Sequence, residues 1–123
     1  MPDIDSLALN VADLRALARR RLPRGVFEFI DRGSEDDLAV HNNRSAFDTY
    51  HLAPAVLKDV SGRTLATQIL GQPSPMPLVG APTGAAGLMW HDGEVALAKA
   101  AAQKKIPFTL STASLTSIER IAA

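Results

Sequence analysis

The 123-residue sequence contains no cysteine. Structural disulfides, thiolate metal sites and a cysteine nucleophile are therefore excluded, and any redox reaction would need a bound cofactor. The three histidines, His41, His51 and His91, lie far apart in the sequence, without a partner at the spacing of metal ligands. We therefore expect no metal site in this chain.

An excess of charge of either sign is also lacking. The sequence has 13 basic and 13 acidic residues, so no long-range field recruits nucleic acid or an anionic membrane. The single basic cluster, Arg19, Arg20, Arg21 and Arg24, is typical of a solvated helix end, where arginine complements the helix dipole. No aromatic residue interleaves with it, and we expect no nucleic-acid partner.

No apolar run approaches the roughly 18 residues of a membrane span. The N-terminus, Met1-Pro2-Asp3-Ile4-Asp5, carries acidic residues where a signal peptide carries positive ones. The sequence therefore predicts no membrane segment in this chain and a cytoplasmic location. Its length is that of one ordinary domain, and 46% hydrophobic residues are enough for a core.

The first third of the chain carries helical patterns. Asn10 followed by Asp13 is typical of a helix start, and the apolar spacing predicts helices over 11–22, over 23–33 after Pro23, and over 34–47. After Tyr50, the ranges 52–57 and 64–70 are typical of short extended pieces, in which we expect an antiparallel pair.

In the second half of the chain, the apolar pattern predicts a βαβ unit. A buried strand over 78–81 precedes a helix over 93–104, whose inward residues are Val95, Leu97, Ala98 and Ala101, and a second strand follows over 108–111. The capping box Thr116-Ser117-Ile118-Glu119 then opens another helix. Because the series stops in that helix, we expect the chain to be the beginning of something larger. The pattern leaves open whether this is a doubly wound sheet or a (β/α)₈ barrel, and both place ligands at the carboxyl ends of their strands.

The end of the first strand is the candidate ligand site. The turn Ala81-Pro82-Thr83-Gly84 has small residues, so its backbone can approach a flat cofactor closely. At the end of the second strand, the hydroxyls of Ser111 and Thr112 have two open roles, a hydrogen bond to a ligand or a capping role in a turn. No glycine-rich dinucleotide loop or P-loop is present.

Taken in order, these segments resemble the N-terminal part of one family, the FMN-dependent α-hydroxy acid oxidases and dehydrogenases, and within it the mandelate dehydrogenase branch. The ordered set that carries the resemblance comprises Leu22-Pro23, Gly33-Ser34-Glu35-Asp36, Asn43-Arg44-Ser45-Ala46-Phe47, Leu57-Lys58-Asp59-Val60-Ser61, Ile69-Leu70-Gly71, Met76-Pro77, Ala81-Pro82-Thr83-Gly84, Asp92-Gly93-Glu94, Leu110-Ser111-Thr112-Ala113-Ser114 and Ser117-Ile118-Glu119.

The resemblance implies an α/β fold, the N-terminal part of a TIM (β/α)₈ barrel with a helical N-terminal extension, truncated after the second barrel strand. Residues 1–123 would then be a single incomplete domain. It would consist of the extension over 1–50, short extended segments over 51–75, and the first two βα units over 76–123.

The resemblance also implies a function: FMN-dependent oxidation of an L-2-hydroxy acid, such as mandelate or lactate, to the 2-keto acid. FMN would contact Ala81, Pro82, Thr83, Gly84 and Ser111. The substrate would meet Ala113, whose small side chain leaves room for a bulky acid, and Phe29, where the family usually has a tyrosine that binds the carboxylate.

The family's catalytic histidine is expected beyond Ala123, so no catalytic residue is assigned here and the chain alone should be inactive. The resemblance further implies that the full-length enzyme is a homo-oligomer. Two other interpretations stay open. The chain is either a non-catalytic half-barrel remnant or interaction module, or an unrelated α/β ligand-binding protein that shares the strand-turn-helix pattern.

Overall fold

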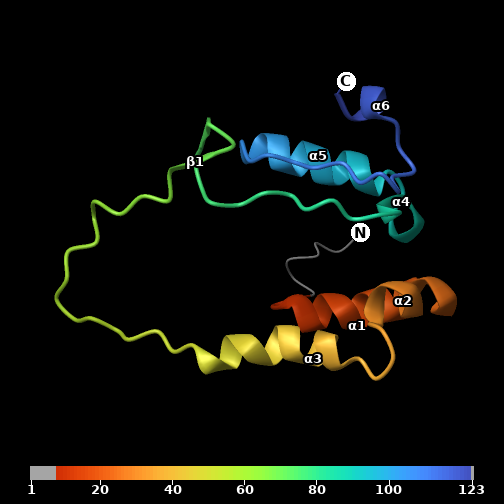
Figure 1. Cartoon of the computed structure of the whole chain (residues 1–123), viewed down its shortest axis with the longest axis horizontal. Helices are drawn as coiled ribbons and strands as arrows, with labels where there is room; N and C mark the ends of the chain where they lie inside the picture. The colour runs from red at the N-terminus through yellow and green to blue at the C-terminus, as the bar shows by residue number, and fades with distance from the viewer. Residues whose placement is uncertain (1–7, 123) are drawn as a thin grey trace. The chain divides into compact units, whose positions relative to one another are not determined.

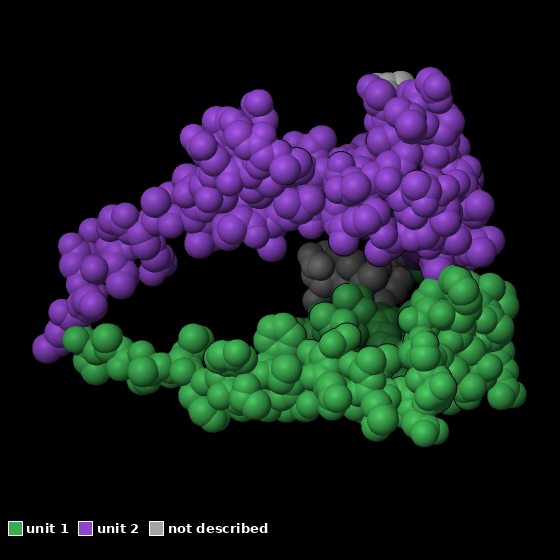
Figure 2. Space-filling view, in the orientation of Figure 1, with its two compact units in different colours: residues 1–56 green, residues 57–123 purple. Residues whose placement is uncertain are grey.

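A computed structural model describes residues 8–122 of the chain. The chain divides into two compact units, residues 1–56 and residues 57–123 (Figure 2). Figure 1 gives the positions of the helices and strands along the chain.

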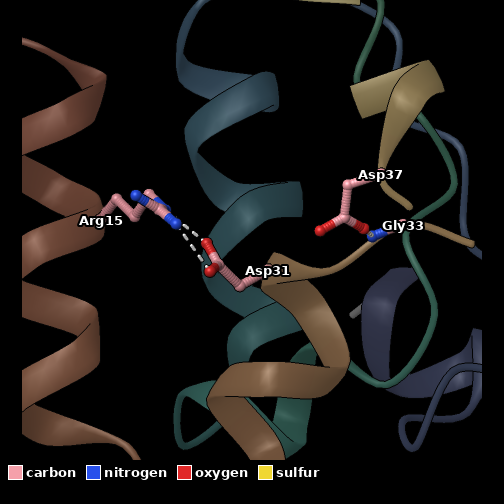
Figure 3. Close-up of polar contacts among 4 residues, drawn as sticks. All are labelled: Arg15, Asp31, Gly33 and Asp37. Carbon is pink, nitrogen blue, oxygen red and sulfur yellow. Dashed lines mark hydrogen bonds and ion pairs between the residues drawn. The ribbon is translucent and has the colours of Figure 1, made fainter. Parts of the chain in front are cut away.

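The first unit begins with the two predicted helices, α1 (Val11–Arg21) and α2 (Arg24–Asp31). Asn10 caps α1 as expected, because its side-chain oxygen accepts the backbone N–H of Asp13 at 3.0 Å. Arg15 of α1 donates two hydrogen bonds to Asp31 of α2, at 2.5 Å and 2.8 Å, which links the two helices (Figure 3).

The third helix, α3 (Leu38–Ser45), begins four residues later than the predicted start at 34, and a 3₁₀ turn, η2 (Ala46–Thr49), follows it. The reason is local. Asp37 has left-handed backbone, with φ of 58°, and its side chain accepts the Gly33 N–H at 2.7 Å (Figure 3). That turn holds residues 33–37 out of the helix.

The second unit opens with a two-stranded antiparallel hairpin, β1 (Thr67–Ile69) and β2 (Gln72–Ser74). The predicted pairing of 52–57 with 64–70 is wrong, and residues 50–66, all of them described, contain no helix or strand. Leu70 and Gly71 both have positive φ, 50° and 77°, and a two-residue turn of that kind returns the chain at once to its neighbour.

Three helices follow: α4 (Ala86–Met89), α5 (Gly93–Gln103) and α6 (Ile118–Ala122). On either side of α5, Gly80 and Phe108 form a parallel bridge. The Gly80 N–H donates to the Pro107 carbonyl at 2.8 Å, and the Thr109 N–H donates to the Gly80 carbonyl at 2.9 Å. The predicted βαβ connection is thus confirmed at this bridge, although neither segment forms a full strand.

Burial is less extensive than the composition predicts. Phe27 and Ala101 are the buried apolar residues of the described chain, whereas Leu78 and Val79 of the predicted buried strand are 55% and 47% exposed. Leu97, predicted to face inward from α5, is 47% exposed. Burial needs a second layer over each apolar face, and no described element supplies one over these side chains.

Candidate functional site

Two loops that follow the Gly80–Phe108 bridge form the candidate site. The first is the turn Ala81 to Gly84, and the second runs from Ser111 to Ala113. The Ala85 N–H donates to the Ala113 carbonyl at 3.0 Å, which joins the loops directly after the first turn. The two loops, each after one partner of the bridge, therefore lie next to each other.

Gly84 lies close to the second loop. A Cβ at this position would lie 3.2 Å from the Ala113 Cβ and 3.7 Å from the Ser111 Oγ. A contact of 3.2 Å is tighter than ordinary van der Waals packing, so glycine lets the backbone of the first loop come against the second.

The surface of the two loops is open. Ala81, Pro82, Thr83 and Gly84 are all exposed, as is Ala113, and Ser111 is half-buried. Side chains no larger than threonine or proline therefore leave backbone amides and carbonyls within reach of a flat ligand.

Ser111 has a turn role that the structure confirms. Its Oγ accepts the Ala113 N–H at 3.1 Å, and its carbonyl accepts the Ser114 N–H at 3.1 Å. A hydroxyl that accepts one hydrogen bond can still donate its hydrogen. Within residues 8–122, that hydrogen meets no acceptor, so the Ser111 hydroxyl can donate to a ligand while it shapes the turn.

Ala85, between the first loop and α4, has left-handed backbone with φ of 53°. A non-glycine residue pays about 1–2 kcal/mol in this region. Its hydrogen bond to Ala113 helps to hold the conformation, which places a strained residue at the junction of the two loops.

Glu94, in the first turn of α5, has a buried side chain to which the sequence analysis assigned no role. It is 1% exposed, and its carboxylate accepts the Leu115 N–H at 3.3 Å and the Thr116 hydroxyl at 3.3 Å. The N–H of Glu94 itself, more than any other group, holds the pKa of the carboxyl below its usual range; burial opposes this, and the Leu115 and Gly87 amides add to the lowering.

Phe29, predicted to meet the substrate, lies in α2 of the first unit and is 71% exposed. The structure thus brings together Gly84, Ser111 and Ala113, all in the second unit, and Phe29 belongs to the other unit. Over residues 8–122, no cluster of three or more His, Cys, Asp or Glu side chains has the geometry of a metal site. No helix in that range is long and apolar enough to span a membrane.

A sequence profile described as "FMN-dependent dehydrogenase" matches residues 18–123. The (S)-mandelate dehydrogenase of Pseudomonas putida is 45% identical over 113 residues, which cover 92% of this chain and 29% of that protein. The L-lactate dehydrogenase of Pseudomonas syringae is 40% identical over 114 residues, 93% of this chain and 30% of that protein. The chain therefore spans less than a third of the length of these curated relatives.

Solved structures give the same likeness. A soluble mutant of the membrane-associated (S)-mandelate dehydrogenase from Pseudomonas putida matches with a TM-score of 0.85 and 46% identity, over 92% of this chain and 32% of that one. The structural neighbours are TIM-barrel enzymes.

Proposed function

Because the chain belongs to the family of FMN-dependent dehydrogenases, we propose that it supplies the N-terminal portion of an enzyme that oxidises an L-2-hydroxy acid, such as mandelate or lactate, to the 2-keto acid. The main support is the meeting of Gly84, Ser111 and Ala113 in two joined, exposed loops. The similar proteins named for mandelate and lactate dehydrogenation point to the substrate class.

The loop residues fit FMN. Ala81, Pro82, Thr83 and Gly84 would contact its ring through small side chains and backbone, and the Ser111 hydroxyl would donate a hydrogen bond to a ring acceptor. When bound, FMN takes up the two electrons that the alcohol carbon loses. The chain's own contribution is to bind and orient the ring and to exclude water from one face.

The substrate would lie against Ala113, whose methyl group leaves space for a large side chain. Phe29 of α2, in the first unit, stays a substrate contact that only the resemblance implies. A phenyl ring gives an apolar contact and cannot donate a hydrogen bond to a carboxylate. The small side chain of Ala113 favours a 2-hydroxy acid with a bulky, aromatic substituent. No side chain of the two loops, Ala81 to Gly84 and Ser111 to Ala113, can act as a general base at neutral pH, so we expect the isolated chain to leave FMN oxidised when mandelate is added.

An NMR titration of the labelled chain with FMN tests the binding role. We expect shifts at the amides of Ala81, Thr83, Gly84 and Ser111. Ser111→Ala should weaken FMN binding about three- to tenfold, the value of one neutral hydrogen bond. Ser61→Ala, the same substitution at an exposed position before β1, is the matched control and should bind as the unsubstituted chain does. Shifts confined to other parts of the chain would contradict the proposal.

A second candidate is a non-catalytic interaction module, favoured by the many exposed large apolar side chains, Leu78, Val79 and Leu97 among them. A partner chain would cover them. Sedimentation of the chain over a range of concentrations separates the two: concentration-dependent assembly without FMN binding supports the module, and a monomer that binds FMN supports the enzyme portion.

The cytoplasmic location and the homo-oligomeric full-length enzyme stay predictions of this proposal. Cell fractionation tests the first directly. The related Pseudomonas putida mandelate dehydrogenase is described as membrane-associated, so recovery of this protein with the membrane fraction would contradict a cytoplasmic location.

A further inference from the structure

Glu94 contacts the chain segment that follows each of the two loops of the candidate site. Gly87 lies in α4, the helix that follows the Ala81 to Gly84 turn. A Cβ added at Gly87 would lie 3.2 Å from the Glu94 Oε2. Leu115 and Thr116, which follow Ser111 to Ala113, donate to the two carboxylate oxygens. One side chain thus touches both chain segments that leave the site.

The hydrogen-bond partners of this carboxylate within the described part of the chain are all donors. Leu115 and its own residue donate backbone N–H groups, Gly87 presents another, and Thr116 donates its hydroxyl. A buried carboxylate surrounded in this way stays ionised, because each donor stabilises the charge. An amide of the same shape would turn its NH₂ group toward N–H donors and leave one of them unsatisfied, at a cost set by desolvation.

We propose that Glu94 is a positioning residue whose buried carboxylate fixes α4 to the loop at Leu115 and Thr116, and so keeps the two candidate FMN-binding loops in register. The FMN part of this inference rests on the function proposed above. Among residues 8–122, the Glu94 side chain hydrogen-bonds to Leu115 and Thr116 and takes no part in the Ala85–Ala113 hydrogen bond. Its effect on the site passes through the segments it holds.

Amide hydrogen exchange in the Glu94→Gln chain tests the clamp without any ligand. The Ala85 amide, bonded to the Ala113 carbonyl, reports whether the loops stay joined, and the Lys104 amide, bonded to the Ala100 carbonyl, reports the integrity of α5. We expect exchange about tenfold faster at Ala85 and Leu115 and unchanged at Lys104. Glu119→Gln, the same substitution at an exposed position of the same unit, should change none of the three.

Thr116→Val keeps the Glu94 carboxylate and removes one of its hydrogen-bond donors, the Thr116 hydroxyl. This variant therefore tests the same clamp even if Glu94→Gln unfolds the chain. It should accelerate Ala85 exchange about threefold. The inference is overturned by unchanged exchange at Ala85 in both variants, or by equal acceleration at Ala85 and Lys104 in both, since the side chain would then support the whole unit and not the register of the loops.

FMN titration separates this inference from the proposed function. If the unsubstituted chain binds FMN, Glu94→Gln should weaken that binding about as much as it accelerates exchange at Ala85. Unchanged FMN affinity alongside loosened loops would overturn the positioning role. Absence of FMN binding by the unsubstituted chain would instead overturn the proposed function, and the exchange rates would still decide whether Glu94 joins the loops.

Discussion

The backbone N–H of Ala85 donates to the carbonyl of Ala113 at 3.0 Å while Ala85 itself holds left-handed backbone, with φ of 53°. The contact that joins the two loops is therefore made by a residue type that disfavours the conformation it needs. Glycine adopts this region without steric cost.

Ala85→Gly should consequently raise the free energy of unfolding of the second unit by up to about 1 kcal/mol. The substitution relieves the strain of the left-handed backbone, and the greater backbone entropy that glycine loses on folding offsets part of that gain. Urea unfolding followed by the fluorescence of Trp90, the single tryptophan, measures this. Ala96→Gly in the exposed face of α5 is the control and should lower stability by about 1 kcal/mol. Equal losses in both variants would contradict the strain at Ala85.

Gly93→Ala should destabilise the second unit by about 1–3 kcal/mol. A Cβ at Gly93 would lie 2.6 Å from the Ala86 carbonyl oxygen and 2.8 Å from its carbon, and backbone atoms of α4 cannot rotate away as a side chain can. The same urea titration applies. Gly62→Ala, where the added Cβ meets nothing within 4 Å, should be neutral or slightly stabilising.

Gly84→Ala tests the approach of the two loops. The new methyl would stand 3.2 Å from the Ala113 Cβ, so we expect about 1 kcal/mol lower stability than in Gly62→Ala. Adding Ala113→Gly removes the Cβ that the new methyl group would contact, so the double variant should recover most of the lost stability. A double variant as unstable as Gly84→Ala alone would place the strain elsewhere.

The pKa of Asp31 should respond to Arg15. The hydrogen bond from Arg15 is the largest cause that lowers it, and the positive charge of the same guanidinium adds to the effect. Arg15→Gln should raise the pKa of Asp31 toward the ordinary aspartate value of about 3.9, as read from its carboxyl carbon in an NMR titration. Arg24→Gln, which removes the partner of Glu28 instead, is the control.

The sign of the pH effect follows from that shift. Because folding lowers the pKa of Asp31, the pair contributes fully above the unfolded value and is lost as pH falls through the folded one. The α1–α2 link should therefore weaken only in acid. An unshifted Asp31 titration in Arg15→Gln would contradict the pairing drawn in Figure 3.

Local signals predicted most of the helices. The start of α1 could be predicted because Asn10 caps the helix through the N–H of Asp13, only three residues away. The observed bounds of α5 are close to its predicted range. The start of α3 was not readable, because the left-handed Asp37 depends on its bond with Gly33.

Features set by distant contacts were missed or misplaced. In the predicted capping box, Ser117 accepts the Arg120 N–H at 3.4 Å, while Thr116 donates its hydroxyl to Glu94, 22 residues away. The burial of Leu78 and Val79 depends on neighbouring layers, which apolar character alone does not supply. For the site, small residues predicted the two loops, but the Glu94 carboxylate, which contacts the segments after them, has no local sequence signature beyond its place in the first turn of α5.

The stretch from 50 to 66 has no helix or strand, and all its side chains are exposed. A protease needs such an extended, accessible segment to fit its active-site cleft, and this one offers trypsin two sites, Lys58 and Arg63. Brief digestion should therefore release a helical N-terminal piece and a C-terminal piece that retains both candidate FMN loops. The two units would become separable reagents, and the C-terminal piece could be assayed for FMN without the first.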